Sequence, residues 1–156
     1  MDLDVGVLGE TGPEVRVQAL LRDRFVGAVR AGHALAQGAV TPERYAACGH
    51  VVASRRGRAS GPVDAALAAL GLARTVVVVV PSFPAVMAVA RASDLVALVP
   101  ERQTEAARVG MHSFPLPVRT PGITVSQMWH PRLDADPAHR WLRGLVLAAC
   151  RDAAQA

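Results

Sequence analysis

The chain has 156 residues, of which 51% are hydrophobic and 19% charged, and its formal net charge is +4. This length suits one domain or two small lobes, and the balance predicts a packed globular chain rather than a disordered tail. Aromatic residues make up only 4% of the chain and the 17 basic residues, all arginine, are spread along it. Direct contact with nucleic acid is therefore not predicted.

Nothing in the sequence predicts a membrane anchor or export. The longest aliphatic run, residues 76–80, is far shorter than the roughly 20 apolar residues that span a bilayer. The first residues lack the features of a secretory signal, so we expect a cytoplasmic protein with no membrane partner. Cys48 and Cys150 are then expected to be free thiols.

The first half of the chain is predicted to alternate between strands and helices. Period-two patterns and β-forming residues indicate the strands. Thr41 and Pro42 suit the N-cap and first position of one helix, and Pro62 opens another. The predicted strands cover residues 3–8, 24–30 and 50–53, the helices cover 42–48 and 62–70, and residues 54–61 form a loop.

The second half continues the same alternation. The β-branched run over 75–80 predicts a strand that is buried on both faces. Three prolines between residues 110 and 122 predict an extended crossing segment, and Trp141 and Leu145 are expected on the packed face of the last helix. The remaining predicted elements are helices over 83–92, 101–108 and 136–152 and strands over 95–99 and 123–129.

This order of elements predicts an α/β fold with a mainly parallel sheet. Ligands of such sheets bind beyond the carboxyl ends of the strands. The loops that follow Ala53, Val80 and Val99 are therefore the places where we expect function.

The loop at residues 54–61 contains three arginines before a helix start. Its guanidinium and backbone N–H groups could hold a carboxylate or phosphate, or the arginines could simply be solvated. The segment lacks the lysine and the spacing of a nucleotide-binding P-loop, so ATP and GTP are not expected.

The turn after the strand at 75–80 offers a hydroxyl and an aromatic ring. A ligand could stack on Phe83 and hydrogen-bond to Ser82, or Ser82 could be an ordinary N-cap and Phe83 a core residue. Ser82 does not stand in a Gly-x-Ser-x-Gly motif, which argues against acyl transfer.

No catalytic residue, metal site or cofactor is predicted. The five histidines show no pairing at zinc-ligand intervals, and Cys48 with His50 lacks an orienting partner for nucleophilic chemistry.

Several motifs, in this order along the chain, resemble the effector-binding domain of LysR-type transcriptional regulators. They are Asp4-Val5-Gly6-Val7, residues 21–30 leading to Gly32-His33-Ala34-Leu35-Ala36, the helix up to Gly71-Leu72, Pro81-Ser82-Phe83, Leu98-Val99-Pro100 and Trp129-His130-Pro131.

The resemblance implies a fold like that of type 2 periplasmic binding proteins, in which two α/β lobes enclose a small effector. Residues 26–122 would form one lobe nearly complete, and residues 1–25 and 123–156 would be a partial second lobe. The residues that match the effector-facing positions are Ser54, Arg55, Gly57, Arg58, Ser82, Phe83 and Pro100.

The resemblance also implies the partners. We expect a small carboxylated effector, whose binding shifts the population of lobe arrangements. DNA would be bound only through a winged helix that this chain lacks. Open sheet edges predict a dimer or higher oligomer.

Two alternatives remain open at the level of sequence. The first is a small α/β enzyme that acts on an anionic substrate, with residues 54–58 as its anion loop and His50 or His130 as general base. The second is a scaffold that binds only another protein.

Overall fold

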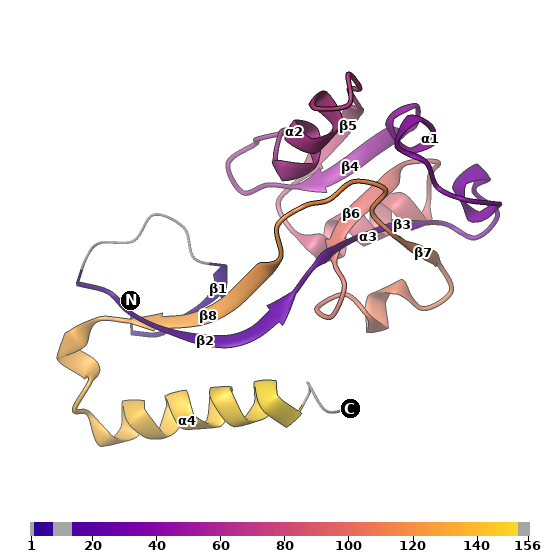
Figure 1. The fold of residues 1–156 in the computed structure, drawn as a ribbon. Helices are drawn as coiled ribbons and strands as arrows, with labels where there is room; N and C mark the ends of the chain where they lie inside the picture. The colour runs from indigo at the N-terminus through magenta and orange to yellow at the C-terminus, as the bar shows by residue number, and fades with distance from the viewer. Residues whose placement is uncertain (1, 8–13, 153–156) are drawn as a thin grey trace. The chain divides into compact units, whose positions relative to one another are not determined.

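The fold is known from a computed structural model that describes residues 2–7 and 14–152 (Figure 1). The chain divides into two compact units. The central unit is Arg24–Pro121, and the terminal unit joins the segment before it to the segment after it. Each unit has its own sheet.

The terminal unit contains a three-stranded antiparallel sheet in the order β1-β8-β2. The strands are β1 (Asp4–Val7), β2 (Arg16–Asp23) and β8 (Ile123–Trp129). The predicted strands at 3–8 and 123–129 are confirmed, except that β1 begins at Asp4 rather than Leu3 and that Leu8 lies outside the described residues. No strand was predicted over β2, which is mostly exposed and polar at its ends and forms a strand by pairing along β8.

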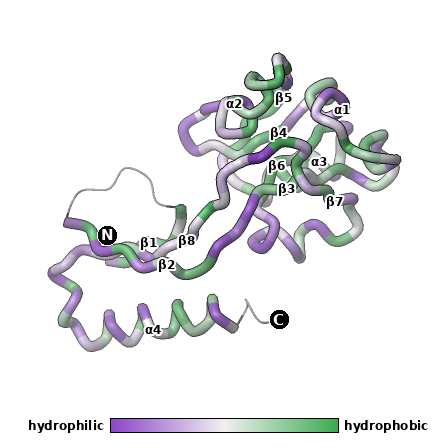
Figure 2. The backbone as a smooth tube through the Cα atoms, in the orientation of Figure 1, coloured by the Kyte–Doolittle hydropathy of each residue, from purple (hydrophilic) through white to green (hydrophobic). Residues whose placement is uncertain are grey.

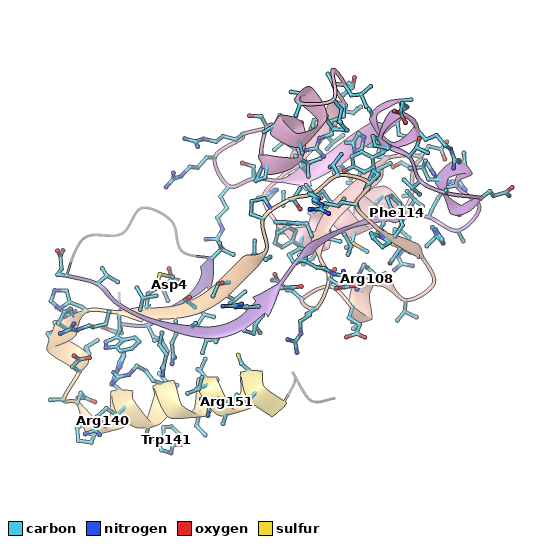
Figure 3. The ribbon with its side chains drawn as sticks, in the orientation of Figure 1. Asp4, Arg108, Phe114, Arg140, Trp141 and Arg151 are labelled. Atoms are coloured by element: carbon cyan, nitrogen blue, oxygen red, sulfur yellow. The ribbon has the colours of Figure 1, made fainter. Side chains whose placement is uncertain are left out.

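Helix α4 (Pro137–Asp152) follows the short 3-10 helix η3 (Pro131–Leu133) and lies along β2 (Figure 1). The predicted helix is confirmed, but its predicted packed face is wrong. Trp141 is 67% exposed and Leu145 48% exposed, and Figure 3 shows Trp141 on the side of α4 away from β2. The inward side carries His139 and Arg143 instead, because their polar atoms find partners there.

The central unit contains a five-stranded sheet in the order β5-β4-β6-β3-β7. The strands are β3 (Phe25–Val29), β4 (Gly49–Ala53), β5 (Thr75–Val80), β6 (Val96–Pro100) and β7 (His112–Pro115).

The expectation of a mainly parallel sheet is wrong. Only the pairings of β4 with β5 and with β6 are parallel among the described strands, whereas β3 runs antiparallel to both β6 and β7. The predicted crossing segment at 110–122 contains the strand β7 near its start, and this strand was not predicted.

Helices cover both faces of the central sheet. Helix α3 (Phe83–Arg91) packs on one face, around Val51, Val86 and Val99. The other face is covered by η1 (Ala34–Ala36), α1 (Pro42–Ala46) and α2 (Pro62–Ala68), around Tyr45 and Leu67. Figure 2 shows hydrophobic residues following β3 and β6 between these layers.

Two local contacts explain why particular residues stand where they do. Thr41 is the N-cap of α1 and accepts a hydrogen bond from the backbone N–H of Arg44, as predicted. Gly27 in β3 has no room for a side chain, because a Cβ there would lie 2.3 Å from the ring of Phe114.

The predicted double burial of β5 is wrong. Its residues alternate between exposed and half-buried, with Val77 58% exposed, because β5 is an edge strand. Val78 and Val80 pack against the cluster around α3, whereas Val77 and Val79 remain at the surface. A β-branched run alone cannot distinguish an edge strand from a central one.

The predicted helix at 101–108 is mostly turn and includes only the 3-10 helix η2 (Ala106–Arg108). Thr104 donates its hydroxyl to the carbonyl of Pro100, and the guanidinium of Arg108 donates to the carbonyl of Glu101. These side chains hold the backbone in turns that end β6. Among the described residues, no helix has the length and apolar character needed to cross a bilayer.

Candidate functional site

The arginine loop is tied to the end of β5. The backbone N–H of Ser54 donates to the carbonyl of Val80 over 2.8 Å, and the Ser54 hydroxyl accepts from the backbone N–H of Arg58 over 2.9 Å. Gly57 has a φ of +68°, a left-handed conformation that favours glycine. The loop thus folds back on itself and leaves the side chains of Arg55 and Arg58 exposed.

The turn after β5 combines both interpretations made from the sequence. Ser82 is the N-cap of α3 through its carbonyl, which accepts from the N–H of Val86, but its exposed hydroxyl makes no capping bond. Phe83 is half-buried and packs against the cluster around α3. The Ser82 hydroxyl and part of the Phe83 ring therefore remain available on this edge.

Phe25, at the start of β3, belongs to the same edge. Its ring centroid lies 6.3 Å from that of Phe83, in a tilted arrangement typical of aromatic pairs. Phe25 could not be singled out from the sequence, because nothing in the local pattern shows that β3 begins beside the start of α3.

Pro100 ends β6 at this edge and is fully buried. Its side chain therefore offers no surface to a ligand and instead positions the next residue. The backbone N–H of Glu101 donates to the carbonyl of Arg24, and the Arg24 guanidinium makes two hydrogen bonds, of 2.5 and 2.8 Å, to the Glu101 carboxylate. Hydrogen bonds from Arg24 lower the pKa of Glu101, which keeps this pair ionised.

A buried polar cluster lies under α1 and α2, on the face of the central sheet opposite α3. The Nε2 of His50 lies 2.9 Å from the carbonyl of Tyr45, and its Nδ1 has no partner in the described structure. Burial lowers the pKa of His50 to about 4 and raises that of Tyr45 to about 12. Arg74, whose side chain is 1% exposed, makes two 2.9 Å hydrogen bonds to Asp64.

These contacts bear on the alternative in which the protein is an enzyme with His50 or His130 as its general base. His50 is fully buried, so it cannot meet a substrate. The Nδ1 of His130 accepts from the backbone N–H of Arg132 in the terminal unit, as an N-cap. No group of three or more metal-ligating side chains comes together in the part of the chain that the structure describes.

The cavities that open on the central unit include two that lie beside β3 and β7. One, of about 200 Å³, is lined by Arg24, Phe25, Pro115, Leu116, Val118, Arg119 and Thr120. The other, of about 470 Å³, follows β7 and is lined by Gly38, Val40 and residues 112–117. Neither cavity could be predicted from the sequence, since both depend on where β7 and the segment after it run.

Comparison with known families identifies this arrangement. Residues 1–151 match the family described as the LysR substrate binding domain. The chain belongs to the LysR substrate-binding domain family. The resemblance found in the sequence is thereby confirmed, together with the α/β fold of type 2 periplasmic binding proteins.

Individual relatives of this LysR domain are transcriptional regulators. The transcriptional activator NahR of Pseudomonas putida is 32% identical over 148 residues, which are 94% of this chain and 49% of NahR. The regulator SyrM of Rhizobium meliloti is 35% identical over 98% of this chain and 48% of its own length. The LysR domain thus spans about half the length of these curated relatives.

A solved structure agrees with this assignment. The regulatory domain of MexT, a transcriptional activator in Pseudomonas aeruginosa, superimposes with a TM-score of 0.78 at 28% identity. The match covers 95% of this LysR domain and 72% of the MexT chain.

Proposed function

We propose that this LysR domain senses a small carboxylated effector and that its parent protein regulates transcription in the bacterial cytoplasm. The hydrogen bond between Ser54 and Val80 carries the proposal, because it joins the arginine loop to the turn that bears Ser82 and Phe83. In this proposal the domain acts by binding its effector.

The chemistry of this edge favours an anion. Arg55 and Arg58 are exposed on a loop whose Gly57 lets the backbone turn, and guanidinium groups bind carboxylates in a two-pronged geometry. Ser82 adds a free hydroxyl and Phe83 an apolar surface. Together they suit a ligand with one carboxylate and an apolar body.

We further propose that residues 26–122 are one lobe of the effector-binding fold and that residues 1–25 and 123–156 are part of the other. Ligand binding would shift the population of lobe arrangements. DNA would be contacted by a winged helix outside this chain.

Replacing Arg55 with glutamine or Phe83 with alanine should weaken effector binding in calorimetric titrations with a panel of small carboxylates. A loss of about tenfold or more is expected for Arg55→Gln, since a charge-assisted contact disappears. Arg151→Gln, an exposed change on α4, is the matched control. Unchanged binding in both site variants, with unfolding temperatures also unchanged, would refute this site.

We also propose that the chain associates with a second copy through β5. Between residues 65 and 90 the one charged side chain is Arg74, which is buried, so the exposed side chains of β5 and of the last turn of α2 carry no charge in a chain rich in arginine. The opposite edge strand, β7, is short and ends in Pro115, which blocks pairing, whereas β5 contains no proline.

Light scattering tests this association. The native chain should be a dimer, and Val77→Lys should shift the equilibrium towards monomer, because the interface would bury the lysine charge without a partner. Val109→Lys is the matched control, since Val109 is 74% exposed and lies in the segment that leads into β7, the edge strand opposite β5. A monodisperse monomer of the native chain at high concentration would count against the proposal.

A further inference from the structure

The 200 Å³ cavity beside β3 has one apolar side and one polar side. Leu116 and Val118 form part of the apolar side, and both are half-buried against the cluster around Tyr45, which holds them in place. The volume is below the roughly 300 Å³ at which pockets for drug-sized ligands begin. A single ring or a short chain is therefore the largest apolar body that this cavity accepts.

The two arginines of this cavity differ in whether their guanidinium groups have a charged partner. Arg24 is bound to Glu101 by a two-pronged ion pair, so its charge is largely neutralised. Arg119 is exposed and makes no hydrogen bond or ion pair with any residue in 2–7 or 14–152. The cavity therefore presents one uncompensated positive charge, next to the half-buried Thr120.

Phe25 connects this cavity to the edge described above. Its ring lines the cavity and also lies 6.3 Å, between centroids, from the ring of Phe83. A ligand in the cavity would thus contact the same aromatic pair as one on the Ser82 turn.

We infer that this cavity is the anchoring subsite of the effector, in which Arg119 binds the carboxylate and Phe25, Leu116 and Val118 hold one small apolar ring. The inference rests on the proposed function and changes the main specificity residue from the loop arginines to Arg119. A monocarboxylate matches the single free charge, whereas a dianion would leave one charge unmatched.

The test is calorimetric titration of the 156-residue chain with cyclohexanecarboxylate and with its neutral match, cyclohexanecarboxamide. We expect the acid to bind, the amide to bind at least about tenfold more weakly, and Arg119→Gln to weaken binding of the acid by at least about tenfold. Arg151→Gln should bind the acid as the native chain does. In NMR spectra, the Nε–Hε signal that disappears in Arg119→Gln should shift when acid is added to the native chain.

The outcomes separate this inference from the proposed function. Equal affinity of Arg119→Gln and the native chain, or no binding of the acid by the native chain, would overturn the subsite. Loss of binding in Arg55→Gln but not in Arg119→Gln would overturn the subsite and leave the effector-sensing proposal standing. If no carboxylate of the wider panel binds, both fail.

Discussion

Lowering the pH should destabilise this domain through His50. Burial lowers the pKa of His50 to about 4, whereas in the unfolded chain it returns to the ordinary value of 6.5. Between these values the unfolded chain binds more protons than the folded one, so the free energy of unfolding falls as the pH falls. The contribution is fully present above pH 6.5 and is lost as the pH approaches 4.

The magnitude follows from the two pKa values of about 4 and 6.5. At about 1.4 kcal/mol for each pKa unit, complete protonation would remove roughly 3 kcal/mol of stability. Between pH 7.5 and pH 5 the expected loss is about 2 kcal/mol. The effect is large because the His50 ring is fully buried. If Nδ1 took up a proton, no acceptor in the described structure would receive its hydrogen bond.

The assay is urea unfolding at pH 7.5 and pH 5 for the native chain and for His50→Leu. Because both tryptophans lie in the terminal unit, unfolding should be followed by circular dichroism rather than by tryptophan fluorescence. The native chain should lose about 2 kcal/mol more than His50→Leu over this interval. His112→Gln, a change at a half-buried histidine of the same unit, should keep the full loss. Equal losses in the native chain and His50→Leu would refute the reasoning.

Two further predictions concern the same unit. Asp64→Asn should destabilise the domain by about 3 kcal/mol, because it leaves the Arg74 guanidinium, which is 1% exposed, without its charged partner. Arg74→Met should destabilise it by clearly less, because the Asp64 carboxylate that it leaves unpaired is 27% exposed. Urea unfolding at pH 7.5 measures both losses, and a larger loss for Arg74→Met would contradict the difference in burial. Gly27→Ala should cost about 2 kcal/mol, since its Cβ would lie 2.3 Å from the Phe114 ring. Adding Phe114→Leu should restore part of the loss in Tm caused by Gly27→Ala, and no recovery would argue against this contact.

The candidate site was only partly predictable. Ser54 and Ser82 could be found because each directly follows a strand that local pattern identifies, and parallel pairing of β4 and β5 then brings their ends together. Arg24, Phe25 and Arg119 could not be found, because their proximity depends on the antiparallel pairing of β3 with β7, and β7 is too short and too rich in proline nearby to be predicted as a strand.

The order of most elements, the family and local features such as the Thr41 cap could be predicted from the sequence, because caps, turns and periodic patterns act within a few residues. The edge position of β5, the outward side of Trp141 and the burial of Pro100 depend on tertiary packing. Burial depends on which distant segments cover a residue, and an apolar run has the same local pattern at the edge of a sheet as at its centre.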